Sequence, residues 1–203
     1  MKFGSLLIFF LLSQLTFAQI KVIKLEKNAI PKSINYLGKI IDAVKYSDTE
    51  GEQIVITTQT GLIDTKDGNR SADLYAYHYL VSGDSFKLTW QLHDFVKDCP
   101  VDITASFIPN TFKITDLDKD GKAEVWLMYK TVCHGDVSPS EMKVIMHEGN
   151  KKFAMRGTNK VKVSDNKYDG GQYTFDETFK SGSELLRRFA GQLWKTNLME
   201  TWK

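Results

Sequence analysis

The chain has 203 residues, of which 42% are hydrophobic, 26% are charged and 12% are aromatic. This is the composition of a globular protein, and it excludes a collagen-like chain, a disordered tail and a protein with many membrane spans. The net charge of +2 results from 27 basic and 25 acidic residues, so there is no electrostatic reason to expect a nucleic acid as the partner.

Residues 1–18 have the features of a signal peptide that is cleaved on export. A basic residue precedes the apolar run LLIFFLL at 6–12, and small residues occupy the last positions before a cleavage site at Ala18. The alternative, a membrane anchor, is disfavoured because the apolar run is short for a membrane span. We therefore predict that residues 19–203 form the exported chain, without a transmembrane segment, in the periplasm, at the cell surface or outside the cell.

The exported chain contains two strand-rich units, at about 36–95 and 104–157, that share an order. Each unit has an acidic turn, an apolar strand, a loop, a second strand, a tight glycine turn and a third strand. The expected strands, from their period-two or β-branched character, are 54–60, 74–81, 86–95, 124–132, 142–147, 152–156 and, after the second unit, 172–179. A weak two-fold internal repeat and chance both explain the shared order. Two units cannot close a propeller, so we expect a sandwich or a pair of blade-like sheets.

The two cysteines, Cys99 and Cys133, favour a disulfide. In an oxidising compartment an even number of cysteines tends to pair. Closing a loop of about 34 residues would stabilise the fold by about 4 kcal/mol in the chain-entropy model. The alternatives are a metal ligand or a catalytic thiol, because His134 follows Cys133 directly.

The segment 115–126, TDLDKDGKAEVW, has the composition of a calcium loop. Calcium takes six to eight oxygen ligands, and alternating carboxylates on a tight turn supply them. Hard carboxylates without a nearby thiolate or imidazole favour calcium over zinc. The predicted ligands are the side chains of Asp116, Asp118, Asp120 and Glu124 and the backbone carbonyl of Lys122.

This loop is not an EF-hand, because its twelfth position is Leu127 and a strand rather than a helix follows. The pattern D-x-D-x-D-G-x-x-E at 116–124, running into an apolar strand, resembles the calcium loops of integrin-type FG-GAP blades. The resemblance implies a structural ion that sets the register of the strand from Val125. The alternative is a metal-free acidic turn, with its charge neutralised by Lys119 and Lys122.

Residues 182–202 carry apolar side chains at helical intervals and predict an amphipathic C-terminal helix. Ser181 and Glu184 have the spacing of a capping box at its start. A helix packed on a sheet is favoured over a membrane-surface helix, because the polar face is only modestly basic. The fold class expected is α+β, mostly antiparallel β, in one domain from 19 to 203.

The stretch 116–157, with EVWLMYKTVCHGDVSPSEMKVIM at its centre, resembles a family of exported bacterial proteins. The match extends back through DCPVDIT at 98–104. This family is labelled surface polysaccharide biosynthesis protein. The resemblance implies a role at the envelope of a double-membraned bacterium, and it brings no known catalytic residues.

A catalytic reading of the loop TVCHGDVSPS is weak. Its candidate residues are Cys133, His134, Asp136 and Ser138, but adjacent side chains on an extended chain point to opposite sides, and a bridged cysteine offers no thiolate. We therefore expect a non-catalytic binding or accessory factor in surface polysaccharide biosynthesis, with a surface glycan or an envelope protein as partner. The alternative is an envelope glycan hydrolase or transferase that uses a carboxylate pair.

Aromatic side chains in the strand segments have two possible fates. They can stack on sugar rings at an exposed face, or they can pack in the core, which is the commoner fate. The residues concerned are Tyr75, Tyr77, Tyr79, Trp90 and Trp126.

Overall fold

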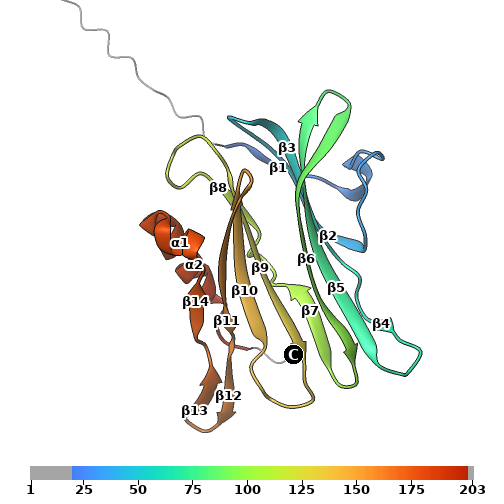
Figure 1. The fold of residues 1–203 in the computed structure, drawn as a ribbon, viewed down its shortest axis with the longest axis vertical. Coiled ribbons are helices and arrows are strands. Elements are labelled where there is room, and N and C mark those ends of the chain that lie inside the picture. The colour runs from blue at the N-terminus through green and yellow to red at the C-terminus, as the bar shows by residue number, and fades with distance from the viewer. Residues whose placement is uncertain (1–19, 201–203) are drawn as a thin grey trace, which may run out of the picture.

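The computed structural model describes residues 20–200, so the predicted signal peptide at 1–18 lies outside the described residues. Two six-stranded sheets lie face to face, and a pair of helices covers the outer face of the second sheet (Figure 1). The strand pairs within both sheets are antiparallel. The predicted β-rich α+β class is therefore confirmed, and the sheets form a sandwich.

The first sheet is built from the N-terminal half of the described chain. Strands β1, β2, β3 and β5 are neighbours in that order, and β4 and β6 both pair with β5. A 3₁₀ turn at Lys27–Ala29 lies between β1 and β2. The strands are β1 (Val22–Lys24), β2 (Lys39–Asp48), β3 (Gly51–Gln59), β4 (Ile63–Asp64), β5 (Arg70–Ser82) and β6 (Ser85–Cys99).

The second sheet has the order β14-β11-β10-β9-β7, with β8 also paired to β9. Strands β12 and β13 form a separate hairpin. One set of four strands in each sheet pairs in the same way, each strand with the next: β2, β3, β5 and β6 in the first sheet and β8, β9, β10 and β11 in the second. In both sets an acidic turn follows the first strand. The strands are β7 (Ile103–Phe107), β8 (Lys113–Thr115), β9 (Glu124–Cys133), β10 (Glu141–Glu148), β11 (Lys151–Thr158), β12 (Lys160–Ser164), β13 (Lys167–Gly170) and β14 (Tyr173–Phe175).

The predicted strand at 172–179 is wrong in its second half. Strand β14 ends at Phe175, and the short helix α1 (Glu177–Ser181) follows. The cause is Asp176, whose carboxylate accepts a hydrogen bond from the backbone N–H of Phe179 at 2.9 Å and so caps a helix.

The C-terminal helix is shorter than predicted. Helix α2 spans Glu184–Thr196, and its N-cap is Ser183, whose hydroxyl accepts from the backbone N–H of Leu185. The expected cap, Ser181, instead donates its hydroxyl to the carbonyl of Glu177 inside α1. After α2 the chain is extended: the Lys160 N–H donates to the carbonyl of Leu198 at 2.8 Å.

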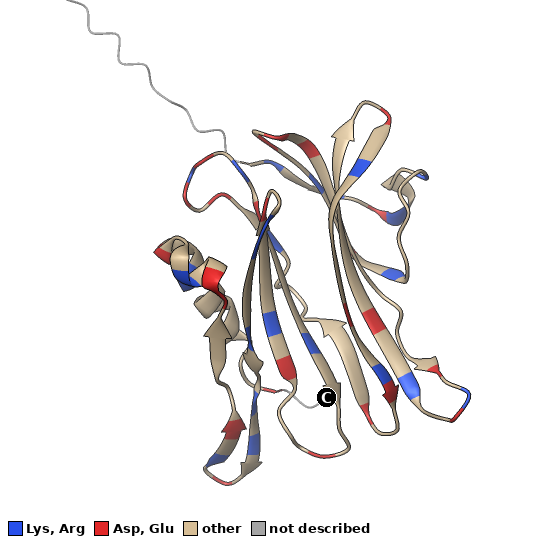
Figure 2. Ribbon diagram, in the orientation of Figure 1, with Lys and Arg blue, Asp and Glu red and all other residues tan. Residues whose placement is uncertain are grey.

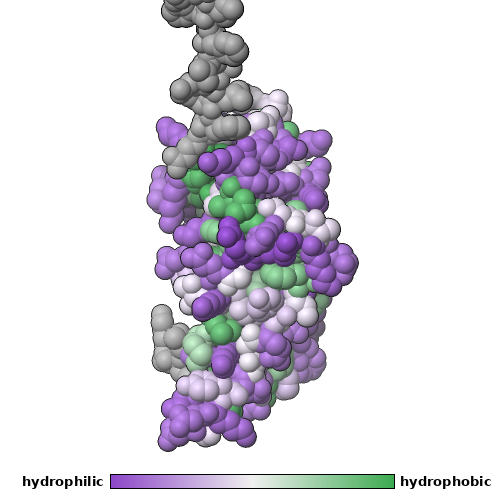
Figure 3. Space-filling view, turned by 90° about the vertical axis from the view of Figure 1, so that its left-hand side faces the viewer, coloured by the Kyte–Doolittle hydropathy of each residue, from purple (hydrophilic) through white to green (hydrophobic). Residues whose placement is uncertain are grey.

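The core has three layers of apolar contact: between the sheets, on the outer face of the second sheet and on the outer face of the first sheet. Between the sheets, small and branched side chains of β5 meet those of β9 and β10. On the outer face of the second sheet, Leu186, Ala190 and Trp194 of α2 pack against Trp126 and its neighbours. The helical side of the molecule is mainly hydrophilic, with its hydrophobic surface broken into separate patches (Figure 3). Helix α2 thus packs on the sheet, as expected, and no helix among residues 20–200 has the length and apolarity to cross a membrane.

The aromatic residues considered as sugar platforms belong to the core. Tyr75, Tyr77 and Tyr79 are only 8%, 4% and 6% exposed, because the segment 25–37 covers the outer face of the first sheet. Trp126 is fully buried. These side chains therefore stabilise the fold and do not form an exposed stacking surface.

A polar cluster lies between the sheets. The His78 ring stacks on Trp90, with ring centroids 4.9 Å apart, and Trp90 stacks on His147 of β10 at 4.0 Å. The His78 Nε2 lies 2.9 Å from the Tyr46 hydroxyl, which donates to the side-chain carbonyl of Gln53 at 2.8 Å. Burial lowers the pKa of His78 to about 4. Burial, together with Lys152 and His78, lowers the pKa of His147 to about 3.

Acid should destabilise this cluster. Above a pH of about 6.5, His78 is neutral in both the folded and the unfolded chain, so it adds no pH dependence. Below that pH the unfolded chain gains a proton that the folded chain does not bind, and stability falls until the folded pKa is reached. We expect a loss of up to about 3 kcal/mol from His78 between pH 7 and pH 4. Urea unfolding across this range measures it. H78Q should show a shallower dependence, and an identical slope would contradict the assignment.

Candidate functional site

The predicted metal loop, residues 116–123, connects β8 to β9 at one end of the sandwich. Figure 2 shows its acidic residues at the same end as the β2–β3 turn and the β10–β11 turn. Each of Asp116, Asp118 and Asp120 places a carboxylate oxygen within 4.8 Å of the others. The loop therefore brings together the three aspartates that the sequence pattern singled out.

Glu148, at the end of β10, is a carboxylate that the sequence analysis missed. A carboxylate oxygen of Glu148 lies within 4.8 Å of those of Asp118 and Glu124. Glu148 is also directly opposite Glu124 in the β9–β10 register. Like charges in such a cross-strand pair are destabilising unless something compensates them. Burial, with Asp120 and Asp118, raises the pKa of Glu148.

The loop conformation follows from its own side chains. Asp118 accepts from the N–H of Asp120 at 3.3 Å, and Asp120 accepts from the N–H of Lys122 at 2.8 Å. Gly121 has φ of +85°, and a Cβ there would lie 2.8 Å from a methyl carbon of Thr49. Glycine is therefore required by both the backbone angle and the close approach.

One aspartate oxygen fits the requirement of a cation. Oδ1 of Asp116 is buried and has no hydrogen-bond partner among residues 20–200. A buried carboxylate oxygen without a partner is costly. Coordination of a hard cation such as calcium, which takes only oxygen ligands, would satisfy it.

Glu124 closes the base of the loop. It is fully buried, and its carboxylate accepts from the Thr115 hydroxyl at 2.6 Å and from the Leu117 N–H at 3.0 Å. Burial raises the pKa of Glu124, more than these hydrogen bonds lower it. Direct coordination by Glu124, and by the carbonyl of Lys122, stays a prediction.

The loop is attached to the first sheet through the β2–β3 turn. Asp48 Oδ2 accepts from the N–H of Ala123 at 2.9 Å, and the Thr49 N–H donates to the carbonyl of Gly121 at 3.0 Å. Lys122 forms an ion pair with Glu50 at 3.5 Å. The two acidic turns that occupy matching places in the two strand units therefore contact each other and join the two sheets.

Cys99 and Cys133 form a disulfide between the end of β6 and the end of β9. The predicted pairing is therefore present, and no thiolate is available at Cys133. Ser138 donates its backbone N–H to Asp136 at 2.9 Å, an arrangement typical of a turn. The sequence cluster at 133–138 thus forms a bridged strand end and an exposed turn, without an assembled nucleophile and base.

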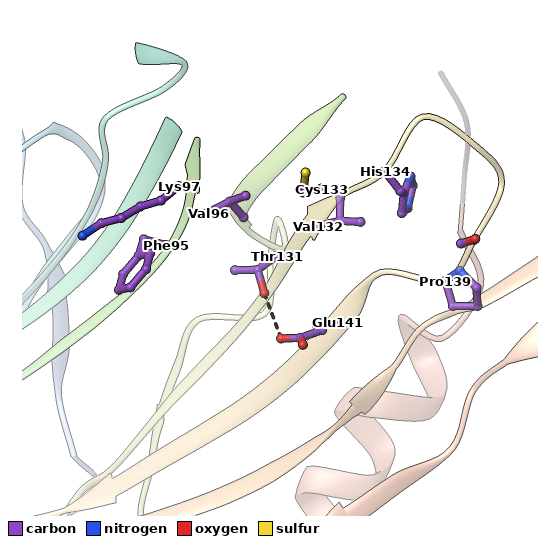
Figure 4. Close-up of a pocket in the computed structure, with 10 residues that line it drawn as sticks. Phe95, Val96, Lys97, Thr131, Val132, Cys133, His134, Pro139 and Glu141 are labelled. Atoms are coloured by element: carbon purple, nitrogen blue, oxygen red, sulfur yellow. Dashed lines mark hydrogen bonds between the residues drawn. The ribbon is translucent and has the colours of Figure 1, made fainter. Parts of the chain in front are cut away.

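A cleft of about 540 Å³ lies beside this disulfide, between β6 and the β9–β10 loop. Figure 4 shows Phe95 and Lys97 of β6 on one side and Thr131 and Glu141 of the second sheet on the other. The Lys143 ammonium lies 2.6 Å from Asp94 and 3.4 Å from Glu141, so it connects the two sheets next to the cleft. Burial raises the pKa of Asp94, but the hydrogen bond and charge of Lys143 outweigh it and the pKa is lowered.

Neither the carboxylate beside the cleft, Asp94, nor the loop pair of Glu124 and Glu148 has the properties of a glycosidase pair. A catalytic acid needs a raised pKa, whereas the pKa of Asp94 is lowered. Glu124 and Glu148 have raised pKa values, but Glu124 is fully buried, so no substrate reaches it. The hydrolase or transferase alternative gains no support from these pairs.

Comparisons with known proteins do not assign a family. The chain matches no protein-family model, no curated protein and no solved structure. The resemblances noted in the sequence therefore rest on the quoted motifs alone, and the function has to be argued from the loop and the cleft.

The contact between Asp48 and the loop should be important for stability. Asp48→Ala removes the acceptor for the backbone N–H groups of Ala123 and Glu50. We expect the free energy of unfolding to fall by about 1–3 kcal/mol, the cost of leaving such donors unpaired. Urea denaturation measures the loss. Glu52→Gln on the same hairpin, which removes only a half-exposed ion pair with Lys45, is the control. Equal stability of the two variants would contradict the role given to Asp48.

Proposed function

We propose that this protein is an exported, non-catalytic accessory factor of the bacterial envelope that binds a surface glycan and holds a structural calcium ion. The convergence of the Asp116, Asp118 and Asp120 carboxylates at the junction of the two sheets carries the calcium part. Export is supported by the disulfide, which is typical of oxidising compartments. The polysaccharide role is supported by the family resemblance of residues 116–157.

The ion would act on the fold rather than on a substrate. A divalent cation compensates the mutual repulsion of the loop aspartates and of Glu148. With that repulsion removed, the backbone contacts of Gly121 and Ala123 to the β2–β3 turn hold the sheets together. Affinity on the order of 10⁻⁴ to 10⁻³ M is expected, as in extracellular calcium modules.

Calcium should stabilise the mature protein. At about 10 mM calcium the expected gain is about 1–3 kcal/mol, which raises the melting temperature by several degrees. Asp118→Asn should abolish the gain, because Asp118 belongs to both carboxylate groups. Asp165→Asn, in the exposed β12–β13 turn, should retain it. Calorimetric melting with calcium and with chelator tests this, and equal melting temperatures would remove the metal from the proposal.

The glycan role is tested by an array of bacterial polysaccharides and oligosaccharides. We expect the mature protein, in the presence of calcium, to retain at least one glycan class without releasing sugar from it. Release of reducing sugar without retention would overturn the accessory role and favour the hydrolase alternative. Absence of any retention would overturn the glycan part of the proposal.

A further inference from the structure

We infer that the free edge of strand β6 binds an extended, acidic peptide segment of a partner protein, which adds a strand to the first sheet. This inference goes beyond the proposed function and does not depend on glycan binding. Strand β6 has 15 residues and pairs only with β5, so its other edge has no strand partner among residues 20–200. An unpaired edge presents a row of backbone N–H and C=O groups with which another extended chain can pair.

The middle of β6 can pair along an unbroken stretch. The β5–β6 register is regular from Trp90 to Val96, and its two irregularities lie on either side of this stretch. No proline occurs in β6, and prolines and bulges are features with which proteins block an exposed edge. The residues 90–96 therefore offer a regular edge to an added strand.

The second sheet continues past this edge. Trp90 stacks on His147 of β10, with ring centroids 4.0 Å apart. Further along β6, the Asp94 carboxylate lies 2.6 Å from the ammonium of Lys143, which precedes His147 on β10. The two strands therefore run alongside each other in opposite directions, with β5 against β7 on one side of them and β11 next to β10 on the other. Because neighbouring strands are about 4.8 Å apart in both sheets, a strand added to β6 would lie over β10 and β11.

Two cations of β11 face the place of this added strand. Lys152 is opposite His147 in the β10–β11 register. Arg156 is opposite Lys143 in the same register. Residues that are opposite each other share a face of the sheet, so both cations lie on the face toward the first sheet. Both are exposed, and neither forms an ion pair in the part of the chain that the structure describes.

The spacing of these cations defines the peptide. Arg156 follows Lys152 by four positions on β11, a distance of about 13 Å at about 3.3 Å per residue. Side chains four positions apart in an extended peptide lie on one face with the same spacing. A peptide with acidic residues at positions i and i+4 would therefore place both carboxylates against the two cations while its backbone pairs with β6.

A second copy of this chain fits the edge less well. Paired through its own β6, it would turn Trp90, Leu92 and Asp94 toward β11, because these side chains point from β6 to the second sheet. Of these only Asp94 is acidic, and its carboxylate is already paired with Lys143. Such a dimer would leave the two cations of β11 without carboxylate partners.

The test is a calorimetric titration of the mature protein with a seven-residue peptide of threonine and valine that carries glutamate at its second and sixth positions. The same peptide with glutamine at these positions should bind at least about threefold more weakly, because two ion pairs are lost. Two further peptides, methylated on the backbone nitrogens of either the odd or the even residues, test the backbone pairing. Alternate residues point their N–H groups to opposite edges of a strand, so one methylated peptide should lose binding and the other should keep it.

Variants of β11 locate the binding surface. Lys152→Gln and Arg156→Gln should each weaken the binding of the glutamate peptide about threefold. Lys151→Gln is the matched control, because the Lys151 ammonium lies 5.0 Å from the centroid of the Phe153 ring, on the face that the helices cover. It should leave the affinity unchanged. All three side chains are exposed, and melting temperatures confirm that the variants fold.

Four outcomes would overturn the inference. Equal affinities of the two methylated peptides would exclude strand addition, and an equal effect of Lys151→Gln would show that only overall charge attracts the peptide. Failure of the wild type to bind the glutamate peptide would remove the site altogether. A concentration-dependent dimer that excludes the peptide, detected by analytical ultracentrifugation, would make a second copy the occupant of the edge. None of these results depends on the glycan array, so this inference and the proposed function can fail separately.

Discussion

Repulsion among the carboxylates at the end of the sandwich is the constraint on which the junction of the two sheets depends. Asp116, Asp118 and Asp120 converge within 4.8 Å, and Glu148 joins the group through Asp118. Backbone donors satisfy part of this charge, but one oxygen of Asp116 is buried without a hydrogen-bond partner in the part of the chain that the structure describes. The same loop carries the contacts to Asp48 and Thr49. Whatever compensates the charge therefore also affects how firmly the sheets are joined at this end of the sandwich.

The strands β3, β5, β6, β9, β10 and β11 were predictable because one physical pattern decides them, whereas β2 and the short strands β1, β4, β7, β8, β12 and β13 were not among those expected. Alternating or β-branched runs such as 54–60 and 142–147 correspond to β3 and β10. Such runs indicate strands because their apolar side chains are buried when the chain is extended within a sheet. Helix boundaries were less predictable because several residues compete as caps. Ser181 had the right spacing, but Asp176 starts a short helix before it and Ser183 starts the next. The local pattern shows which residues can cap a helix and does not show which of them does.

The site was only partly predictable, because register and coverage are not local properties. Glu148 lies opposite Glu124 through the pairing of β9 with β10, and no motif around either residue reveals it. The tyrosines of β5 alternate as if one face were exposed, but the distant segment 25–37 covers that face. Phe95, on the neighbouring edge strand, stays exposed. What this face of the first sheet exposes therefore depends on what the N-terminal segment leaves uncovered.

The acidic loop at 116–123 and the cleft lie at opposite ends of strand β9, and this distance limits how an ion bound in the loop would affect a ligand in the cleft. Strand β9 has ten residues, from Glu124 at the loop to Cys133 at the cleft, a length of about 30 Å at about 3.3 Å per residue. At that distance, charge in the loop is screened from the cleft by solvent ions. An ion can then influence the cleft only through the stability and register of the sheet. Chelation at temperatures well below melting should accordingly leave the shape of the cleft intact, because the disulfide and the Asp94–Lys143 pair hold it independently.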